Sequence, residues 1–374
     1  MVMGKTTENH KQFMQMALNE ARKGAGKVSP NPMVGCVIVS GGKVISTGYH
    51  PCFGGPHSEV VALTKVKGSL KDATMYLTLE PCCHTRKKTP PCVPLVLKSG
   101  IRNLVIAMKD PNPAVSGRGI KILRKNGIKC VIGVLENEAR ELNKPYIKWV
   151  TRQLPYVTLK WAMSLDGKIA ARGGDSMWIS SKESRSQVHA LRAQTDAILV
   201  GIGTVLKDNP YLTAHGKGRN PLRLVIDPEL KIPLNSNVLN EQAKTIVFYD
   251  KSKEKLLNHK LNKIGETTHK TVGLRTNKNG HVYLKELVKY LASERTASLL
   301  IEGGGHTNAQ ALEQRIVDEI IAYVSPIVIG GRDAVTPVEG LGSKTIEKSI
   351  KFVNWVVSNS GPDFKITARL DTRN

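Results

Sequence analysis

The chain has 374 residues, which is too long for one ordinary hydrophobic core and suits two domains. Its formal charge is +24, from 55 lysines and arginines against 31 acidic residues, but basic and acidic residues are scattered together from end to end. A nucleic-acid-binding surface is therefore not predicted, and the positive charge suits phosphorylated small molecules. No apolar run approaches the roughly 20 residues of a membrane-spanning helix, so no membrane association is expected.

Six cysteines are spread along the chain, and the first residues contain no signal-like apolar segment. Sparse cysteines in a chain of this length are typical of a reducing compartment, where thiols stay free or bind metals. We therefore expect a cytoplasmic protein.

The first part of the chain alternates between helical and strand patterns. A helix is predicted over 8–22, and a hairpin over 34–47 turns at Gly41-Gly42. Further helices are expected at 58–66, 93–98 and 119–125, and further strands at 75–79, 104–108 and 130–134. This alternation predicts a largely parallel sheet covered by helices on both faces.

A second α/β alternation follows a polar-faced helix over 136–152, which is broken or kinked at Pro145. Strands are expected at 157–162, 196–200 and 297–301. We place the domain boundary after residue 150, which gives domains over 1–150 and 151–374.

Two short motifs in the first domain have the composition of a zinc site with a proton shuttle. His57 and Glu59 stand one residue apart at a helix start, and cysteines follow at 82, 83 and 92. A zinc deaminase uses three histidine or cysteine ligands and a carboxylate that is not a ligand. Zinc lowers the pKa of a bound water from about 15.7 to about 7. Glu59 would take that water's proton and pass it to a departing amine, which predicts ammonia release from an aminopyrimidine-like ring.

The motifs Pro-His-Ser-Glu at 56–59, Leu-Glu-Pro-Cys at 79–82 and Thr-Pro-Pro-Cys at 89–92 resemble the deaminase half of the bifunctional riboflavin-biosynthesis deaminase/reductase family. The resemblance continues through nearly the whole chain. It implies an α/β protein in which a cytidine-deaminase-like three-layer domain precedes a dihydrofolate-reductase-like domain. It also implies one zinc per chain and the cofactor NADPH.

The cysteine region departs from the family pattern in two respects. Ser58 stands where the family usually has alanine, and the loop between the cysteines is one residue longer. Cys82 and Cys83 are therefore both candidates for the middle ligand, and we predict His57, Cys82 and Cys92, because Cys82 directly follows Glu80-Pro81. The loop also contains Arg86, Lys87 and Lys88, and we expect it to face the substrate.

Three further positions in the first domain have two interpretations each. The resemblance implies that Asn31 holds the substrate ring, although an asparagine between prolines is also an ordinary turn residue. His50 matches the substrate-side histidine of the family, with a structural role as the alternative. Asp110 follows a strand, where it either borders the pocket or forms a plain turn.

The main cofactor signal in the second domain is a glycine-rich turn after the strand at 297–301. Glu302 and three glycines precede a helix predicted over 308–314. Unpaired N–H groups at a helix start suit a cofactor pyrophosphate. The turn lacks the Gly-x-Gly-x-x-Gly fingerprint with a following acid, so a Rossmann domain is not predicted.

By resemblance, the second domain passes a hydride from NADPH to the anomeric carbon of an opened ribosylamino group. Residues carried over by position as cofactor contacts are Ala162, Trp178, Thr204, Asp208, Gly304, Gly305, His306, Thr307 and Asn308. Those carried over as substrate contacts are Ser176, Arg192, Leu212, His215, Arg219 and Glu302. Lys160 is predicted to be a proton donor or phosphate partner, with a structural surface lysine as the alternative.

His215 stands where the family usually has an arginine that binds the substrate phosphate. Arginine stays charged and binds phosphate bidentately, whereas histidine, with an ordinary pKa of about 6.5, is mostly neutral above pH 7. Our hypothesis is that Arg219 supplies the lost contact. The alternative is that His215 binds the phosphate and makes binding sensitive to pH.

The sequence is therefore interpreted as two consecutive enzymes acting on a phosphorylated pyrimidine, with no nucleic-acid or membrane partner, in a homo-oligomer. A nucleic-acid deaminase of the tRNA-editing kind shares the zinc motif but leaves 151–374 unexplained. A non-catalytic zinc-stabilised nucleic-acid-binding protein would have no use for Glu59.

Overall fold

The computed structural model describes residues 2–85 and 89–371, and the side chains from residue 8 onward within those ranges. The chain divides into two compact units, Met1–Gln153 and Leu154–Asn374, and this division falls just after the boundary expected at residue 150. No helix among the described residues combines the length and the apolar character needed to cross a membrane.

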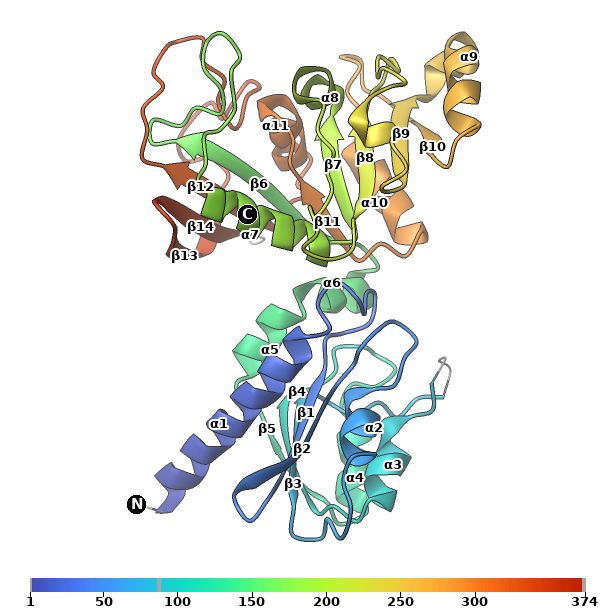
Figure 1. The fold of residues 1–374 in the computed structure, drawn as a ribbon, viewed down its shortest axis with the longest axis vertical. Helices are drawn as coiled ribbons and strands as arrows, with labels where there is room; N and C mark the ends of the chain where they lie inside the picture. The colour runs from blue at the N-terminus through green and yellow to red at the C-terminus, as the bar shows by residue number, and fades with distance from the viewer. Residues whose placement is uncertain (1, 86–88, 372–374) are drawn as a thin grey trace. The chain divides into compact units, whose positions relative to one another are not determined.

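The first unit has a five-stranded sheet in the order β2-β1-β3-β4-β5 (Figure 1). Its strands are β1 (Gly35–Ser40), β2 (Lys43–Tyr49), β3 (Thr74–Leu79), β4 (Asn103–Met108) and β5 (Lys129–Ile132). Strand β1 is antiparallel to both β2 and β3, whereas β3, β4 and β5 are parallel. The predicted hairpin and the predicted parallel strands are both confirmed.

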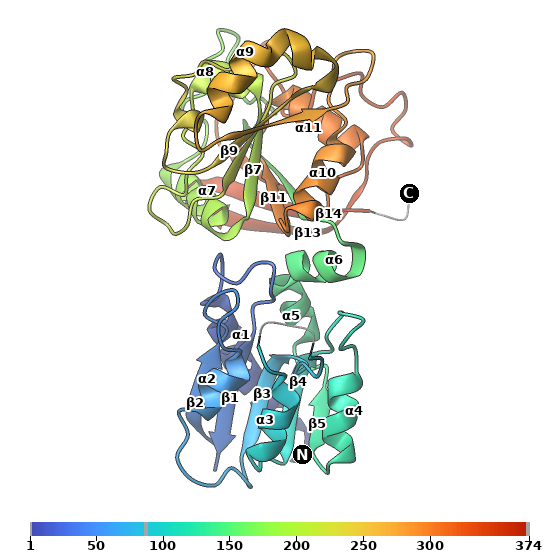
Figure 2. The same ribbon diagram turned by 90° about the vertical axis from the view of Figure 1, so that its right-hand side faces the viewer.

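Helices cover both faces of this sheet because successive strand residues point to opposite sides. Helices α2 (Ser58–Leu63), α3 (Cys92–Lys98) and α4 (Arg118–Lys125) pack on the face that carries Met75 and Leu77. Helices α1 (Val2–Arg22), α5 (Glu136–Leu142) and α6 (Lys144–Arg152) pack on the face that carries Tyr76. Figures 1 and 2 show the resulting three layers.

The second unit has a nine-stranded sheet in the order β10-β9-β8-β7-β11-β6-β12-β14-β13. Its strands are β6 (Tyr156–Ser164), β7 (Ala197–Gly201), β8 (Leu222–Ile226), β9 (Thr245–Asp250), β10 (Lys270–Leu274), β11 (Ser298–Ile301), β12 (Glu319–Ser325), β13 (Phe352–Ser360) and β14 (Asp363–Leu370). All neighbours from β10 to β12 are parallel, and β14 is antiparallel to both β12 and β13.

Helices also lie on both faces of the second sheet (Figure 2). They are α7 (Lys182–Gln194), α8 (Ile202–Asp208), α9 (Glu254–Gly265), α10 (Leu284–Ser293) and α11 (Gly305–Glu313), with short 3₁₀ turns at Asn237–Leu239 and Lys251–Lys253. Apolar residues of α10 and α11 pack on one face, and residues of α8 and α9 pack on the other.

Two predicted helices have different bounds in the structure. The helix expected over 136–152 is interrupted at Asn143, and Pro145 stands in the first turn of α6, where its missing N–H costs little. The helix predicted over 308–314 begins earlier, at Gly305, and Gly304 is its N-cap. The glycine turn is therefore shorter than predicted, and part of it forms the first turn of α11.

The close approach of α1 to β1 requires glycine at position 35. A β-carbon on Gly35 would lie 1.9 Å from the Ala17 carbonyl oxygen and 2.7 Å from the Ala21 nitrogen, both in the backbone of α1. Such overlap cannot be relieved by rotating a side chain, so α1 would have to leave the sheet.

We expect Gly35→Ala to lower the free energy of unfolding of the first unit by about 1–3 kcal/mol, in the range of overpacked cores. Urea unfolding measures this change. Gly265→Ala is the control, because a β-carbon there meets nothing within 4 Å. Equal stability of the Gly35→Ala and parent chains would contradict the close packing of α1.

Candidate active sites

One cluster of metal-ligating side chains lies in the first unit. His57 directly precedes α2, Cys82 follows β3, and Cys92 begins α3. Their ligand atoms all lie within 4.8 Å of one another, and His57 Nδ1 is 3.5 Å from Cys82 Sγ and 3.3 Å from Cys92 Sγ. Cys83 is not part of this cluster. Two thiols and an imidazole nitrogen are a donor set that suits zinc and leaves a fourth tetrahedral position open.

Neighbouring groups fix the orientation of these ligands. The Nε2 atom of His57 is 3.1 Å from the Thr89 hydroxyl, which suits a ring protonated at Nε2 with the Nδ1 lone pair directed at the thiols. The Cys92 N–H donates to the Cys82 carbonyl at 3.0 Å and lies 3.3 Å from its sulfur. The start of α3 therefore holds both cysteines against each other.

Glu59 lies in the first turn of α2 and is almost fully buried. Burial, with a smaller contribution from Cys82, raises the pKa of its carboxyl group. The Ser58 hydroxyl donates to Glu59 Oε2 at 2.9 Å, so the serine that departs from the family pattern contacts the carboxylate directly. A raised pKa makes the carboxylate a better proton acceptor, which suits a group that takes up and delivers protons.

Asn31 and His50 lie together beside the cluster. The Pro56 carbonyl accepts a hydrogen bond from His50 Nδ1 at 2.9 Å, and His50 Nε2 accepts from the Asn31 amide at 3.1 Å. The rings of His50 and His57 meet edge to face with centroids 5.3 Å apart. Both of the predicted substrate-side residues are therefore connected to the metal-ligating histidine.

The carboxylates after β3 and β4 hold loops. Buried Glu80 accepts hydrogen bonds from the backbone of Asp110, Gly117 and Ile120. Asp110 accepts from the Tyr146 hydroxyl at 2.8 Å, and burial raises its pKa to about 6. For Asp110 the structure therefore favours the turn over a direct place in the site. Residues 86–88 of the cysteine loop, which we expected to face the substrate, lie outside the described residues.

The second unit contains a cavity of about 1210 Å³. It lies at the carboxyl ends of β6, β7 and β11 and at the start of α11, the edge where open α/β sheets place ligands. The predicted residues that line it are Lys160, Ala162, Ser176, Trp178, Arg192, Thr204, Asp208, Leu212, His215, Glu302, Gly304, Gly305, His306 and Thr307.

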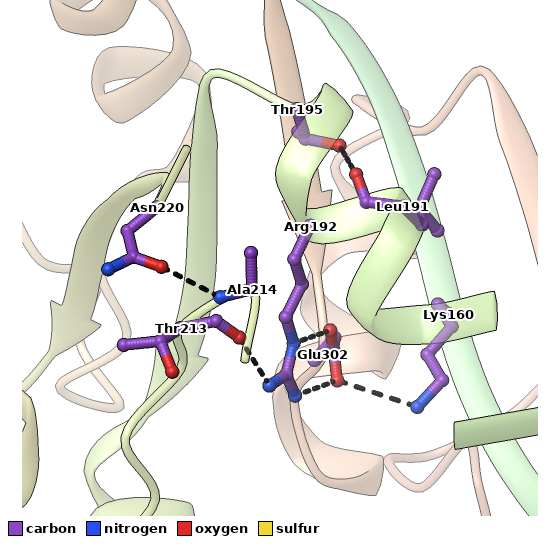
Figure 3. A network of polar contacts seen from close by, with 8 residues as sticks. All are labelled: Lys160, Leu191, Arg192, Thr195, Thr213, Ala214, Asn220 and Glu302. Carbon is purple, nitrogen blue, oxygen red and sulfur yellow. Dashed lines mark hydrogen bonds and ion pairs between the residues drawn. The ribbon is translucent and has the colours of Figure 1, made fainter. Parts of the chain in front are cut away.

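A buried carboxylate between two cations lies in this cavity (Figure 3). Arg192 of α7 forms two hydrogen bonds to Glu302, at 2.8 and 3.0 Å, and Lys160 of β6 lies 3.4 Å from the same carboxylate. Burial alone would raise the pKa of Glu302, but Arg192 and Lys160 lower it to about 2. Glu302 is therefore ionised, and the three side chains together carry one net positive charge.

Each of the two units matches a different family of known proteins. Residues 7–108 match the family described as the cytidine and deoxycytidylate deaminase zinc-binding region, and residues 155–363 match the RibD C-terminal domain. The riboflavin biosynthesis protein RibD of Aquifex aeolicus is 41% identical over 96% of this chain and 98% of its own. The chain belongs to the RibD family. It is a bifunctional deaminase and reductase of riboflavin biosynthesis, with zinc and NADPH as cofactors.

Other RibD proteins show the same relationship. The Bacillus amyloliquefaciens protein is 36% identical over 95% of both chains. A solved structure from Thermotoga maritima, a diaminohydroxyphosphoribosylaminopyrimidine deaminase/5-amino-6-(5-phosphoribosylamino)uracil reductase, is 35% identical. It covers 98% of this chain and 100% of its own, with a TM-score of 0.85. The fold predicted from the RibD resemblance is thus confirmed for both units.

Two residues carried over from the RibD family lie outside the cavity. The Arg219 guanidinium pairs with Asp196 at 2.5 Å and lies 3.4 Å from the Thr195 carbonyl, at the amino end of β7. Asn308 is fully buried, donates from its side chain to the Pro337 carbonyl, and has its N–H bonded to the Gly304 carbonyl. Neither residue therefore lines the cavity in which we expected Arg219 to contact the substrate and Asn308 to contact the cofactor.

Sequence reasoning missed His189, which lines the cavity and stacks on His215 with ring centroids 4.2 Å apart. Burial, with smaller contributions from His215 and Arg192, lowers the pKa of His189 to about 4, and burial and Arg192 also lower that of His215. The only signal in the sequence was the spacing of three between His189 and Arg192, which puts them on one helix face. Arg185, also missed, lies 4.5 Å from the centre of the Trp178 ring.

The geometry of the His57–Cys82–Cys92 cluster predicts which Cys→Ser variants retain zinc. Cys82→Ser and Cys92→Ser should each lose most of the one zinc per chain, because each removes a clustered sulfur. Cys83→Ser should retain it and is the matched control. Metal analysis of the purified chains decides between them, and zinc loss in Cys83→Ser with retention in Cys82→Ser would reverse the assignment.

Proposed function

We propose that the first unit deaminates 2,5-diamino-6-(5-phosphoribosylamino)pyrimidin-4(3H)-one by hydrolysis and that the second reduces the ribosyl chain of the product to ribityl with NADPH. The observation that carries this proposal is the pairing of a His57–Cys82–Cys92 cluster beside buried Glu59 with a separate cationic cavity. Supplying the diaminopyrimidine with NADPH should give ammonia release and NADPH oxidation together. Ammonia without NADPH oxidation would exclude the second step.

In the deaminase, His57, Cys82 and Cys92 would hold the zinc, which when bound lowers the pKa of a water ligand. Glu59 accepts a proton on its carboxylate and delivers it to the leaving amine. Asn31 orients the pyrimidine edge, since an amide can both donate and accept. Its bond to His50 supports this role, because it fixes which face of the amide is presented to a ligand.

In the reductase, NADPH supplies the hydride, and the chain supplies position and charge. Gly305, His306 and Thr307, the first residues of α11, line the cavity, and the N–H groups of a helix start suit the cofactor pyrophosphate. Ala162, Trp178, Thr204 and Asp208 line the same cavity as further cofactor contacts, and Ser176 and Leu212 as substrate contacts.

Lys160 is the proton donor in this proposal. Each hydride added to the opened sugar requires one proton, and Glu302 holds the Lys160 Nζ atom at 3.4 Å within the cavity. Glu302 also holds Arg192, whose guanidinium donates to the Thr213 carbonyl at 3.2 Å. We therefore assign Glu302 the role of fixing the two cations that face the substrate.

We further propose that the protein is a cytoplasmic homo-oligomer acting on small molecules and not on nucleic acid. Its six cysteines, all within the part of the chain that the structure describes, form no disulfide bond, as is usual in a reducing compartment. Strand β13, at the end of the nine-stranded sheet, exposes Trp355, Val356 and Val357, and self-association would cover such an apolar edge.

Glu59→Gln should retain zinc and lose about 10²- to 10⁴-fold in the rate of ammonia release, because glutamine keeps the shape but cannot accept a proton. Supplied with the already deaminated aminouracil, the variant should oxidise NADPH near the parent rate. A parallel loss of both activities would mean that the two reactions share one site.

The structure changes our expectation for the substrate phosphate, and we assign the contact to His215 with His189 beside it. His215→Ala should raise the reductase KM severalfold, whereas Arg219→Ala, the matched control outside the cavity, should leave it nearly unchanged. A severalfold rise in Arg219→Ala alone would restore the earlier hypothesis.

This assignment also predicts a pH dependence. In the free enzyme burial and Arg192 lower the pKa of His215, and the His189 ring stacks on it. A bound phosphate raises that pKa, so the added affinity is present at low pH and is lost as pH rises through the raised value. In the parent, KM should climb as pH rises from the lowered pKa of free His215 to the raised pKa of the bound form. It should stay flatter in His215→Arg, because arginine carries a permanent charge. The ionisation of the substrate phosphate affects both proteins equally. Identical profiles would exclude a titrating His215.

A further inference from the structure

Asn143 connects two segments of the deaminase unit that are far apart in sequence. It stands between α5 and α6 and is 1% exposed. Its Oδ1 accepts a hydrogen bond from the Met33 N–H at 2.8 Å, and its Nδ2 donates to the Met33 carbonyl at 3.0 Å. One side-chain amide therefore satisfies both backbone polar groups of a residue 110 positions earlier.

Met33 needs such a partner because it lies just outside the sheet. The pairing of β1 with β2 begins at Gly35 and Tyr49, and one further bond joins His50 N–H to the Val34 carbonyl. Met33 comes one residue before that last bond. An amide side chain can replace the missing strand, since it offers one donor and one acceptor side by side.

The backbone of Asn143 is bonded within its own helices, where its N–H lies 3.2 Å from the carbonyls of Ala139 and Arg140, but its side chain is directed mainly to Met33. Its side chain also lies 3.4 Å from the Ala139 carbonyl at the end of α5, but this contact is longer than both bonds to Met33. The side chain of a residue that only ended a helix would bond mainly to that helix. The contacts instead have the form of a clamp on the segment before β1.

That segment carries Asn31 two residues away. The Asn31 N–H is bonded to the Val28 carbonyl at 2.8 Å, so the short stretch between this bond and Met33 is fixed at both ends. The Asn31 side chain in turn donates to His50, whose ring lies against His57. The contacts therefore run without a break from Asn143 to the metal-ligating histidine.

We propose that Asn143 is a positioning residue for deamination, which fixes the Asn31–His50 pair by clamping the backbone of Met33. The inference depends on the deaminase activity proposed above and adds to it a residue that touches neither substrate nor metal. Displacing a substrate-orienting group by about 1 Å can cost on the order of 100-fold in rate. Removing the clamp is therefore expected to lower the rate of ammonia release and not only the stability of the chain.

The test is a double-mutant cycle with Asn31. Asn143→Ala should lower kcat/KM for ammonia release by about 10- to 100-fold, while zinc content and NADPH oxidation with the deaminated substrate stay near the parent values. If Asn143 acts through Asn31, adding Asn143→Ala to Asn31→Ala should change little further, because coupled residues are not additive. Fully additive losses in the cycle would overturn the proposal.

Tyr146→Phe is the matched control. It removes a buried hydrogen bond from the same pair of helices, but that bond goes to Asp110 and not to the segment before β1. Its effect on kcat/KM should be additive with Asn31→Ala. If its coupling to Asn31 equals that of Asn143, the effect is general loosening of the helices and the clamp is refuted.

Loss of zinc in Asn143→Ala and absence of ammonia release in the parent chain are two further possible outcomes. If Asn143→Ala is recovered without zinc, Asn143→Asp, which keeps the acceptor for the Met33 N–H, provides the same cycle and should show a smaller loss. If the parent chain itself releases no ammonia, the proposed deamination fails, and that result is independent of Asn143.

Discussion

Both units place their chemistry where parallel strands end, because the polar groups at those ends leave the sheet and need new partners. In each unit a glutamate comes directly after a buried strand: Glu80 after β3 and Glu302 after β11. Burying an ionised carboxylate is costly unless it is fully hydrogen-bonded or paired with cations. The two carboxylates have different partners. For this reason Glu80 stabilises the end of its sheet, whereas Glu302 contributes to a ligand-binding cavity at the end of the other.

Glu80 is satisfied by backbone N–H groups, which hold the loop after β4 and the start of α4. Those bonds direct the Glu80 oxygens into the fold and fix the edge on which Cys82 stands. Glu302 is satisfied by Arg192 and Lys160, so one positive charge remains at the cavity. The same sequence position, a glutamate after a strand, therefore builds a support in one unit and an anion-attracting site in the other.

Part of the large positive charge of the chain lines this cavity. Arg185, Arg192, Lys160 and Lys207 line it together with two histidine pairs, one formed by His189 with His215 and the other by His281 with His306. A cofactor and a substrate that both carry phosphates would need such a lining. Arg219 contributes to the charge count equally but pairs with Asp196 outside the cavity, so the count alone did not reveal where the charge acts.

The sequence by itself determined the elements and the chemistry that depend on neighbouring residues. Strand and helix periodicity, the one-residue spacing of His57 and Glu59 at a helix start, and a glycine turn after an apolar strand are all local patterns. Only the tertiary structure brought Cys82, and not Cys83, together with His57 and Cys92, left Arg219 and Asn308 out of the cavity lining, and stacked His189 on His215. It also brought Asn143 to Met33 across 110 residues. Each of these outcomes depends on how distant segments pack, and no local pattern records which buried polar group will meet which partner.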